Sequence, residues 1–212
     1  GATEIYKVGG AQAVAALGCG TESIGAVDKL FGPGNSFVVE AKRQMFGRVS
    51  IDLLPGPSEI LIIADASARA DWVAADLLAQ AEHGGDSQLV LLSNSSRLLE
   101  GVKREMKDQS KGLLRQAQIK EVLRSGTTLV LVKSLNQAIK LANNFAAEHV
   151  SLIVRHEEKI LPKIRTAGAI FVGSYSPVAV GDFLAGPSHT LPTGGAGKSF
   201  SGLTTEMFQR RT

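Results

Sequence analysis

Apolar residues along this chain alternate between two spacings. Short β-branched runs are typical of buried strands, and the segments between them have helical spacing. The predicted strands are Ile51–Leu54, Glu59–Ala64, Gln88–Leu92, Thr127–Val132, Val150–Val154 and Ala169–Val172. The predicted helices are Ala70–Glu82, Ser96–Asp108, Gly112–Arg124, Leu135–Ala146 and Glu157–Thr166. This rhythm predicts an α/β fold, with a doubly wound, mostly parallel sheet covered by helices on both faces.

The first fifty or so residues form a separate block, with a short strand expected at Ile5–Val8 and helices at Gly10–Leu17 and Ser36–Phe46. Two prolines and a glycine in Pro55-Gly56-Pro57-Ser58 break any element and indicate a boundary. A second boundary follows Gly173, where the alternation gives way to loop residues. We therefore expect three parts, over residues 1–57, 58–173 and 174–212.

Composition narrows the classes of function. The chain has 212 residues, 44% of them hydrophobic, which is ample for a core, and a net charge of +3. Basic residues are spread among acids without a basic stripe, which argues against nucleic-acid binding. No stretch is apolar enough to span a membrane, so no membrane partner is expected. The lone Cys19 excludes an internal disulfide and is expected to be a buried small side chain.

Two polar side chains stand at the end of the predicted helix over residues 70–82. Gln80 and His83 are three residues apart, so both face the same side of the last turn. The negative end of the helix dipole there favours a nearby cation. A metal-binding pair is one interpretation. A solvated helix end is the other, and the spacing alone favours it because Gln is not a usual zinc ligand.

A second pair, Glu148-His149, lies at the start of an apolar strand. Neighbouring residues in a strand point to opposite faces, so both line one site only where the chain is still turning. A His can accept a proton from an alcohol, and a Glu can activate water. By itself the dipeptide fits an acid–base pair and a hydrated loop equally well.

A loop over residues 181–193 carries Asp182 and His189. Its two glycines and two prolines fix an irregular path. Ordered loops with Asp and His are more often functional than not, and Asp182 offers an oxygen ligand or an electrostatic partner. Earlier in the chain, glycines precede two helices, next to Gln12 and Asn35. A helix N-terminus there can face an anion, although neither segment matches the dinucleotide fingerprint and a tight turn explains both.

Taken together, several segments occur in a characteristic order: GGAQAVAAL, VDKLFGPGN, AKRQMFG, IDLLPGPSEILIIAD, AADLLAQAEH, AEHVSL, AGAIFVG, GDFLAGPSHTLPT and SGLTTEMFQRR. In this order they resemble histidinol dehydrogenase, and the resemblance covers essentially the whole chain. It implies two Rossmann-like domains, with an NAD-side domain in part over residues 1–57 and the main catalytic domain over 58–173. It also implies a zinc-dependent homodimer that oxidises L-histidinol through L-histidinaldehyde to L-histidine with two molecules of NAD.

The resemblance also implies roles for individual residues. The matched zinc ligands are Gln80, His83 and Asp182, and the matched catalytic acid–base pair is Glu148 and His149. The matched substrate-binding positions are Ser58, Gln80, His83, His149, Asp182 and His189. The positions matched to NAD contacts are Gln12 and Asn35.

Two departures from the family pattern lead to an expectation about the isolated chain. The resemblance leads us to expect that the family's fourth zinc ligand, a His, and a substrate-contacting Glu would lie in a segment after Thr212, and that a further N-terminal part would precede Gly1. Within the matched motifs, Ser188 replaces a common Asn. Because three ligands are matched where a closed zinc site needs four, we expect the isolated chain to bind zinc weakly and to turn over poorly.

Two other functions remain open at this point. One is a zinc hydrolase that uses Gln80, His83 and Asp182 with Glu148 as the base. The other is a non-catalytic relative that retains the fold. The expected compartment is the cytoplasm, or the plastid if the source is a plant.

Overall fold

The computed structural model describes residues 1–210 and 212, which form two compact units. The larger unit is Pro57–Gly202, and the smaller is Gly1–Gly56 together with Leu203–Thr212. The predicted boundary near Pro57 coincides with this division. The segment expected as one C-terminal part over 174–212 is shared between the units instead, because residues up to Gly202 pack with the sheet.

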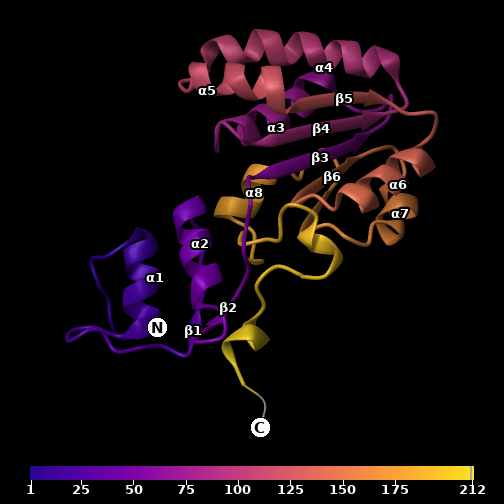
Figure 1. Cartoon of the computed structure of the whole chain (residues 1–212). Helices are drawn as coiled ribbons and strands as arrows, with labels where there is room; N and C mark the ends of the chain where they lie inside the picture. Colours follow the sequence, from indigo (N-terminus) through magenta and orange to yellow (C-terminus); the bar gives the residue numbers. More distant parts are fainter. Residues whose placement is uncertain (211) are drawn as a thin grey trace. The chain divides into compact units, whose positions relative to one another are not determined.

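A five-stranded parallel sheet forms the centre of the larger unit (Figure 1). Its strand order is β5-β4-β3-β6-β7, so the chain first builds outward from β3 and then returns to the other side of it. The strands are β3 (Glu59–Ala64), β4 (Gln88–Ser93), β5 (Thr127–Leu131), β6 (His149–Ile153) and β7 (Ala169–Val172). Register pairs β3 with both neighbours, since Ile60 lies opposite Leu89 of β4 and His149 of β6.

Helices cover both faces of this sheet, as the alternating pattern predicts (Figure 1). The helices of the unit are α3 (Ala70–Ala81), α4 (Ser96–Gln109), α5 (Gln116–Glu121), α6 (Leu135–Phe145), α7 (Glu157–Ile160) and α8 (Val178–Phe183). One apolar cluster joins α3, α4, α5 and α8 to the face that contains Ile60 and Ile62. A second joins α6 and α7 to the face that contains Leu61 and Ile63. Every residue of β3 is buried, as expected for a central parallel strand.

The smaller unit contains two helices and a minimal parallel pair of strands. Its elements are α1 (Gly10–Cys19), β1 (Lys29–Leu30), α2 (Ser36–Met45) and β2 (Ser50–Ile51). The helices pack through small and flexible residues, since a Cβ on Gly18 would lie 2.5 Å from the Met45 side chain. The 3-10 turn Thr205–Phe208 returns to this unit, where Phe208 stacks on Phe31 with ring centroids 4.1 Å apart.

Several local predictions were wrong. Ile5–Val8 is not a strand, and Ile5 is 87% exposed, because no strand among the described residues pairs with it. The strand expected at Ile51–Leu54 ends at Ile51. Cys19 is exposed at the end of α1, where the neighbouring Gly18 takes the buried position.

Two predicted helices are also shorter than the apolar spacing suggested. The helix expected over 112–124 is α5 followed by a π turn, Val122–Gly126. The helix expected over 157–166 is α7 followed by the 3-10 turn Leu161–Lys163, because Pro162 lacks the N–H that would continue α7. Among the described residues, no helix has the length and hydropathy needed to cross a membrane.

Candidate active site

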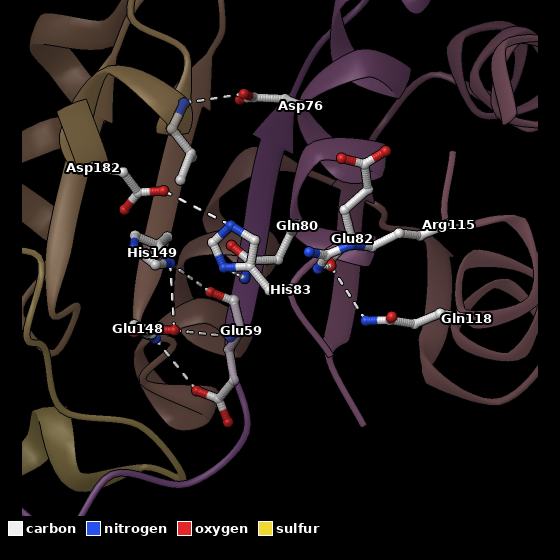
Figure 2. A network of polar contacts seen from close by, with 11 residues as sticks. Glu59, Asp76, Gln80, Glu82, His83, Arg115, Gln118, Glu148, His149 and Asp182 are labelled. Carbon is white, nitrogen blue, oxygen red and sulfur yellow. Dashed lines mark hydrogen bonds and ion pairs between the residues drawn. The ribbon is translucent and has the colours of Figure 1, made fainter. Parts of the chain in front are cut away.

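Predicted site residues of the larger unit lie close together at one edge of its sheet, namely Gln80, His83, Glu148, His149 and Asp182 (Figure 2). Glu148 and His149 stand where β6 begins, and Ser58 directly precedes β3. Because α3 runs back against the direction of the strands, its C-terminal end returns to this same edge. Ligands of open parallel sheets usually bind at the carboxyl ends of the strands. Here the polar residues collect at the amino ends.

Three side chains from α3, the turn that follows it and α8 approach one another at this edge. The Gln80 Nε2 atom lies 3.4 Å from His83 Nδ1. On the other side of the ring, His83 Nε2 lies 3.8 Å from Asp182 Oδ2. Two hydrogen bonds fix the backbone next to His83. The Glu82 carbonyl accepts them from the side chains of Arg115 and Gln118, at 2.7 and 3.2 Å (Figure 2). The predicted metal trio is thus assembled from positions about one hundred residues apart in sequence.

The chemistry of this trio fits a divalent cation. Gln80 is only 2% exposed, and its Oε1 atom is buried without a hydrogen-bond partner. An unsatisfied buried oxygen costs free energy that a bound cation would recover. The trio offers two oxygen atoms and an imidazole nitrogen, at the negative end of the α3 dipole. No group of three His, Cys, Asp or Glu in the described part of the chain is arranged for a metal, and the trio here includes the amide of Gln80 instead.

The turn before β6 brings Glu148 and His149 to the same place. Helix α6 ends at Phe145, and the capping residue Ala146 has a left-handed φ of 56°; Ala147 and Glu148 then lead into the strand. A left-handed residue without glycine is uncommon and needs support from its surroundings, here complete burial of Ala146. The turn places the Glu148 Oε2 atom 3.5 Å from His149 Nδ1.

Hydrogen bonding selects one tautomer of His149. Its Nδ1 atom lies 3.0 Å from the backbone carbonyl oxygen of Glu59, which can only accept. Neutral His149 therefore carries its proton on Nδ1 and leaves Nε2 as an acceptor. The residue is 5% exposed, and burial lowers its pKa below the ordinary value, against the opposing effect of the Glu59 carbonyl. The imidazole is thus neutral and basic at Nε2 near neutral pH.

Glu148 is held in a form suited to proton exchange near neutrality. Its Oε2 atom accepts the Glu59 backbone N–H at 3.0 Å, while Oε1 accepts no hydrogen bond from the described residues. Burial raises the pKa of Glu148 to about 7, opposed by that N–H and assisted by the carboxylates of Glu59 and Asp182. A carboxyl group with this pKa can act as an acid or a base at physiological pH.

The other two predicted substrate-binding residues, Ser58 and His189, have few contacts in the structure. Ser58 is half-buried beside Glu59, and its carbonyl accepts the Gln88 N–H at 3.0 Å. His189 is exposed and forms no hydrogen bond or ion pair with the described residues. The neighbouring Ser188 hydroxyl accepts the Thr190 N–H at 3.1 Å, so this residue stiffens the loop.

Gln12 and Asn35 belong to the smaller unit. Gln12 is exposed in the first turn of α1. Asn35 caps α2, since its Oδ1 atom accepts the N–H groups of Phe37 and Val38 at 3.1 and 3.2 Å. The cap leaves the side-chain amide of Asn35 exposed for other contacts.

Two buried carboxylates of the site were missed from the sequence. Glu59 and Asp76 are 4% and 8% exposed. Asp76 accepts the Val178 N–H at 3.0 Å and the Ser151 hydroxyl at 3.2 Å. It therefore joins α3 to β6 and to the start of α8. A signal was present, because Asp76 lies four residues before Gln80 on the apolar face of its helix.

A large hollow of the same unit lies elsewhere. About 860 Å³ in volume, it lies between α4, α5 and the edge strand β5. Leucine side chains and the stems of lysines line it, including Leu99, Leu129, Lys103 and Lys107. It lacks convergent acid–base groups, and we do not consider it the active site.

Comparison with known proteins agrees with this geometry. The family model described as histidinol dehydrogenase matches residues 1–212. This chain belongs to the histidinol dehydrogenase family. The histidinol dehydrogenase of Bradyrhizobium diazoefficiens is 47% identical over 212 residues, which are 100% of this chain and 49% of that protein. That of Shewanella oneidensis is also 47% identical, with 100% of this chain and 49% of the relative covered.

A solved structure of histidinol dehydrogenase from Elizabethkingia anophelis has the same fold. It matches with a TM-score of 0.93 and 40% identity, over 96% of this chain and 47% of that one. The chain therefore spans about half the length of the histidinol dehydrogenases that it matches. The α/β fold with a parallel sheet, predicted from the apolar pattern, is confirmed.

Proposed function

We propose that this chain supplies the acid–base pair and three metal ligands of an enzyme that oxidises L-histidinol to L-histidine with NAD. Family membership supports the substrate and the reaction. The observation that carries the proposal is the state of His149, with Nδ1 bound to the Glu59 carbonyl and Nε2 left as a base. An alcohol oxidation needs such a base, because a proton leaves the hydroxyl as hydride leaves the carbon.

The site residues divide the reaction between them. His149 takes the hydroxyl proton of L-histidinol at Nε2, and hydride leaves the same carbon, which gives the aldehyde. Once protonated, the imidazole still donates from Nδ1 to the Glu59 carbonyl and faces the Glu148 carboxylate at 3.5 Å. The positive charge that forms on the ring is therefore stabilised where it appears.

Glu148 acts in the second half. Its carboxylate takes a proton from the water that adds to L-histidinaldehyde, while the protonated His149 returns its proton to the aldehyde oxygen; this forms the hydrate and leaves His149 neutral again. A second hydride then leaves that carbon, His149 takes the second hydroxyl proton, and the product is the carboxylic acid. The balance is one water consumed, two hydrides transferred and an alcohol converted to an acid.

Gln80, His83 and Asp182 would hold a zinc ion in this proposal. When bound, zinc would orient the imidazole and amine of the substrate as a Lewis acid. The buried, unpartnered Oε1 atom of Gln80 supports this assignment. The exposed His189 and the half-buried Ser58 would complete the substrate contacts.

Gln12 and Asn35 would contact NAD, which accepts the two hydrides. Both side chains are exposed in the smaller unit, and Asn35 opens a ten-residue helix whose N-terminus favours an anionic group. A homodimer and a cytoplasmic location complete the proposal. The free Cys19 is consistent with a reducing compartment.

The test is NADH formation from L-histidinol by a polypeptide of the relatives' length that contains this chain, with zinc added. We expect His149→Ala to lower kcat by roughly 100- to 10,000-fold, as for loss of a general base. Glu148→Gln should slow the step after the aldehyde, seen as a lower rate with L-histidinaldehyde as substrate. The exposed Glu100→Gln variant is the charge-matched control. Absence of NADH in the wild type, or full rates in both site variants, would exclude this function.

A further inference from the structure

Glu59 is a buried carboxylate for which the catalytic steps above provide no role. It opens β3, is 4% exposed and forms no ion pair with any described residue. A buried charge without a cation is costly unless hydrogen bonds compensate it. Its four hydrogen bonds with described residues that involve a side chain are directed at the acid–base pair or at the loop beside it.

The first two contacts form a reciprocal clamp with Glu148 (Figure 2). The Glu59 N–H donates to Glu148 Oε2 at 3.0 Å, and the Glu148 N–H donates to Glu59 Oε2 at 3.3 Å. Each carboxylate therefore caps the backbone of the other across the β3–β6 pairing. The clamp restricts the Glu148 carboxylate and keeps two acidic groups close together.

The remaining contacts reach His149 and the loop after His189. The Glu59 carbonyl accepts from His149 Nδ1 at 3.0 Å, and Glu59 Oε1 accepts the Gly194 N–H at 3.1 Å. Gly194 lies in a turn and has a φ of 62°. Its hydrogen bond to the side chain of Glu59 links this turn to β3. One residue thus touches both members of the pair and the loop that follows the predicted substrate contact.

We propose that Glu59 is a positioning residue that holds Glu148, His149 and the Gly194 turn as one hydrogen-bonded unit. The inference rests on the proposed function for its catalytic consequence, but the unit itself is a property of the structure. Glu59 also raises the pKa of Glu148 through charge, since a nearby second carboxylate disfavours ionisation of the first. Among the described residues, the other titratable groups that act on Glu148 are His149 on β6, 3.5 Å away, and Asp182 on α8.

Three variants separate these effects. Glu59→Gln retains the size and one oxygen acceptor but removes the charge. Glu59→Ala removes both carboxylate contacts, while the backbone N–H and carbonyl remain. The exposed Glu100→Gln on α4 again controls for loss of one negative charge.

The first measurement does not depend on activity. Titration of the Glu148 carboxyl by carbon NMR, assigned with Glu148→Gln, should move to lower pH in Glu59→Gln and stay unchanged in Glu100→Gln. Hydrogen exchange at the Gly194 amide should accelerate in Glu59→Ala by roughly tenfold or more, as a buried hydrogen bond is lost, and less in Glu59→Gln. Unfolding curves identify any variant that has lost its fold, and Glu59→Gln is the variant expected to keep it.

The second measurement is turnover. In Glu59→Gln the acid limb of the plot of kcat against pH should move to lower pH, and KM should change by less than about threefold. In Glu59→Ala kcat should fall by roughly 10- to 100-fold, because Glu148 and His149 are no longer held in place. A folded Glu59→Gln variant with an unchanged Glu148 titration and an unchanged pH profile would overturn the inference. If the wild type makes no NADH while the titration still moves, the proposed function fails and the positioning role stands.

Discussion

Replacement of Asp76 tests whether the buried network of α3 supports the site. This carboxylate accepts the Val178 N–H at the start of α8 and the Ser151 hydroxyl of β6. Asp76→Ala leaves both donors without a partner in a buried region. Asp76→Asn keeps the shape, retains an oxygen for Val178 and offers an amide N–H to the Ser151 oxygen.

The magnitudes follow from these contacts. Each buried polar group left without a partner costs about 1–3 kcal/mol, so Asp76→Ala should lower the free energy of unfolding by roughly 2–5 kcal/mol. Removal of a buried charge offsets part of that loss. Asp76→Asn should cost far less, because both hydrogen bonds can be remade.

The pH dependence separates the two variants further. Burial raises the pKa of Asp76 above its ordinary value, although its two hydrogen bonds oppose the shift. Between the ordinary and the raised pKa, the folded chain binds more protons than the unfolded chain. Wild-type stability therefore falls as the pH rises through this window, and the Asn variant lacks that loss. Relative to the wild type, Asp76→Asn should gain stability from acidic pH to neutrality.

Urea unfolding followed by circular dichroism, repeated across this pH range, measures both effects. Asp71→Asn on the same helix is the matched control. Its carboxylate is exposed, and a hydrogen bond from Arg69 lowers its pKa, so its contribution is small and is lost as the pH falls. The reasoning would be refuted if Asp76→Asn were as unstable as Asp76→Ala near neutrality, or if its difference from the wild type did not vary with pH.

Three further outcomes follow from the site. Gln80→Ala should weaken zinc binding by roughly tenfold or more, measured by competition with a chromophoric chelator, and unchanged affinity would remove Gln80 from the metal site. Gly168→Ala should lower turnover more than it lowers the free energy of unfolding, because the new Cβ would lie 2.6 Å from the Glu148 carbonyl oxygen and displace Glu148. Turnover equal to that of the wild type would contradict this. Because the pKa of Glu148 is raised to about 7, oxidation of L-histidinaldehyde should decline as the pH falls below about 7, and Glu148→Gln should lack that limb.

Much of the fold follows from the apolar pattern, because strand and helix periods reflect which side chains leave water. The runs at residues 59–64 and 88–92 predicted buried strands, and β3 and β4 lie there. Burial of β3 on both faces explains its uninterrupted apolar run. The errors were at the margins, where Ile5 and Leu54 are apolar but exposed, since spacing does not reveal whether a partner strand exists.

For the candidate site, too, the sequence predicted some features and the tertiary structure was needed for others. Sequence segments alone indicated Gln80, His83, Asp182, Glu148 and His149 through the family resemblance. The spacing of Gln80 and His83 by itself favoured a solvated helix end. In the structure Gln80 is buried and its Oε1 atom has no hydrogen-bond partner, which supports the metal-binding proposal over a solvated side chain at this residue.

By itself, then, the sequence determined the α/β class and the central strands and, through the family resemblance, named the candidate reactive side chains, because these depend on local period and on motifs along the chain. Only the tertiary structure decided which edge of the sheet holds the site, which tautomer His149 adopts and why Glu59 and Asp76 are buried. These properties arise from contacts between residues 75 to 135 positions apart. Such contacts exist only once the parallel strands have paired.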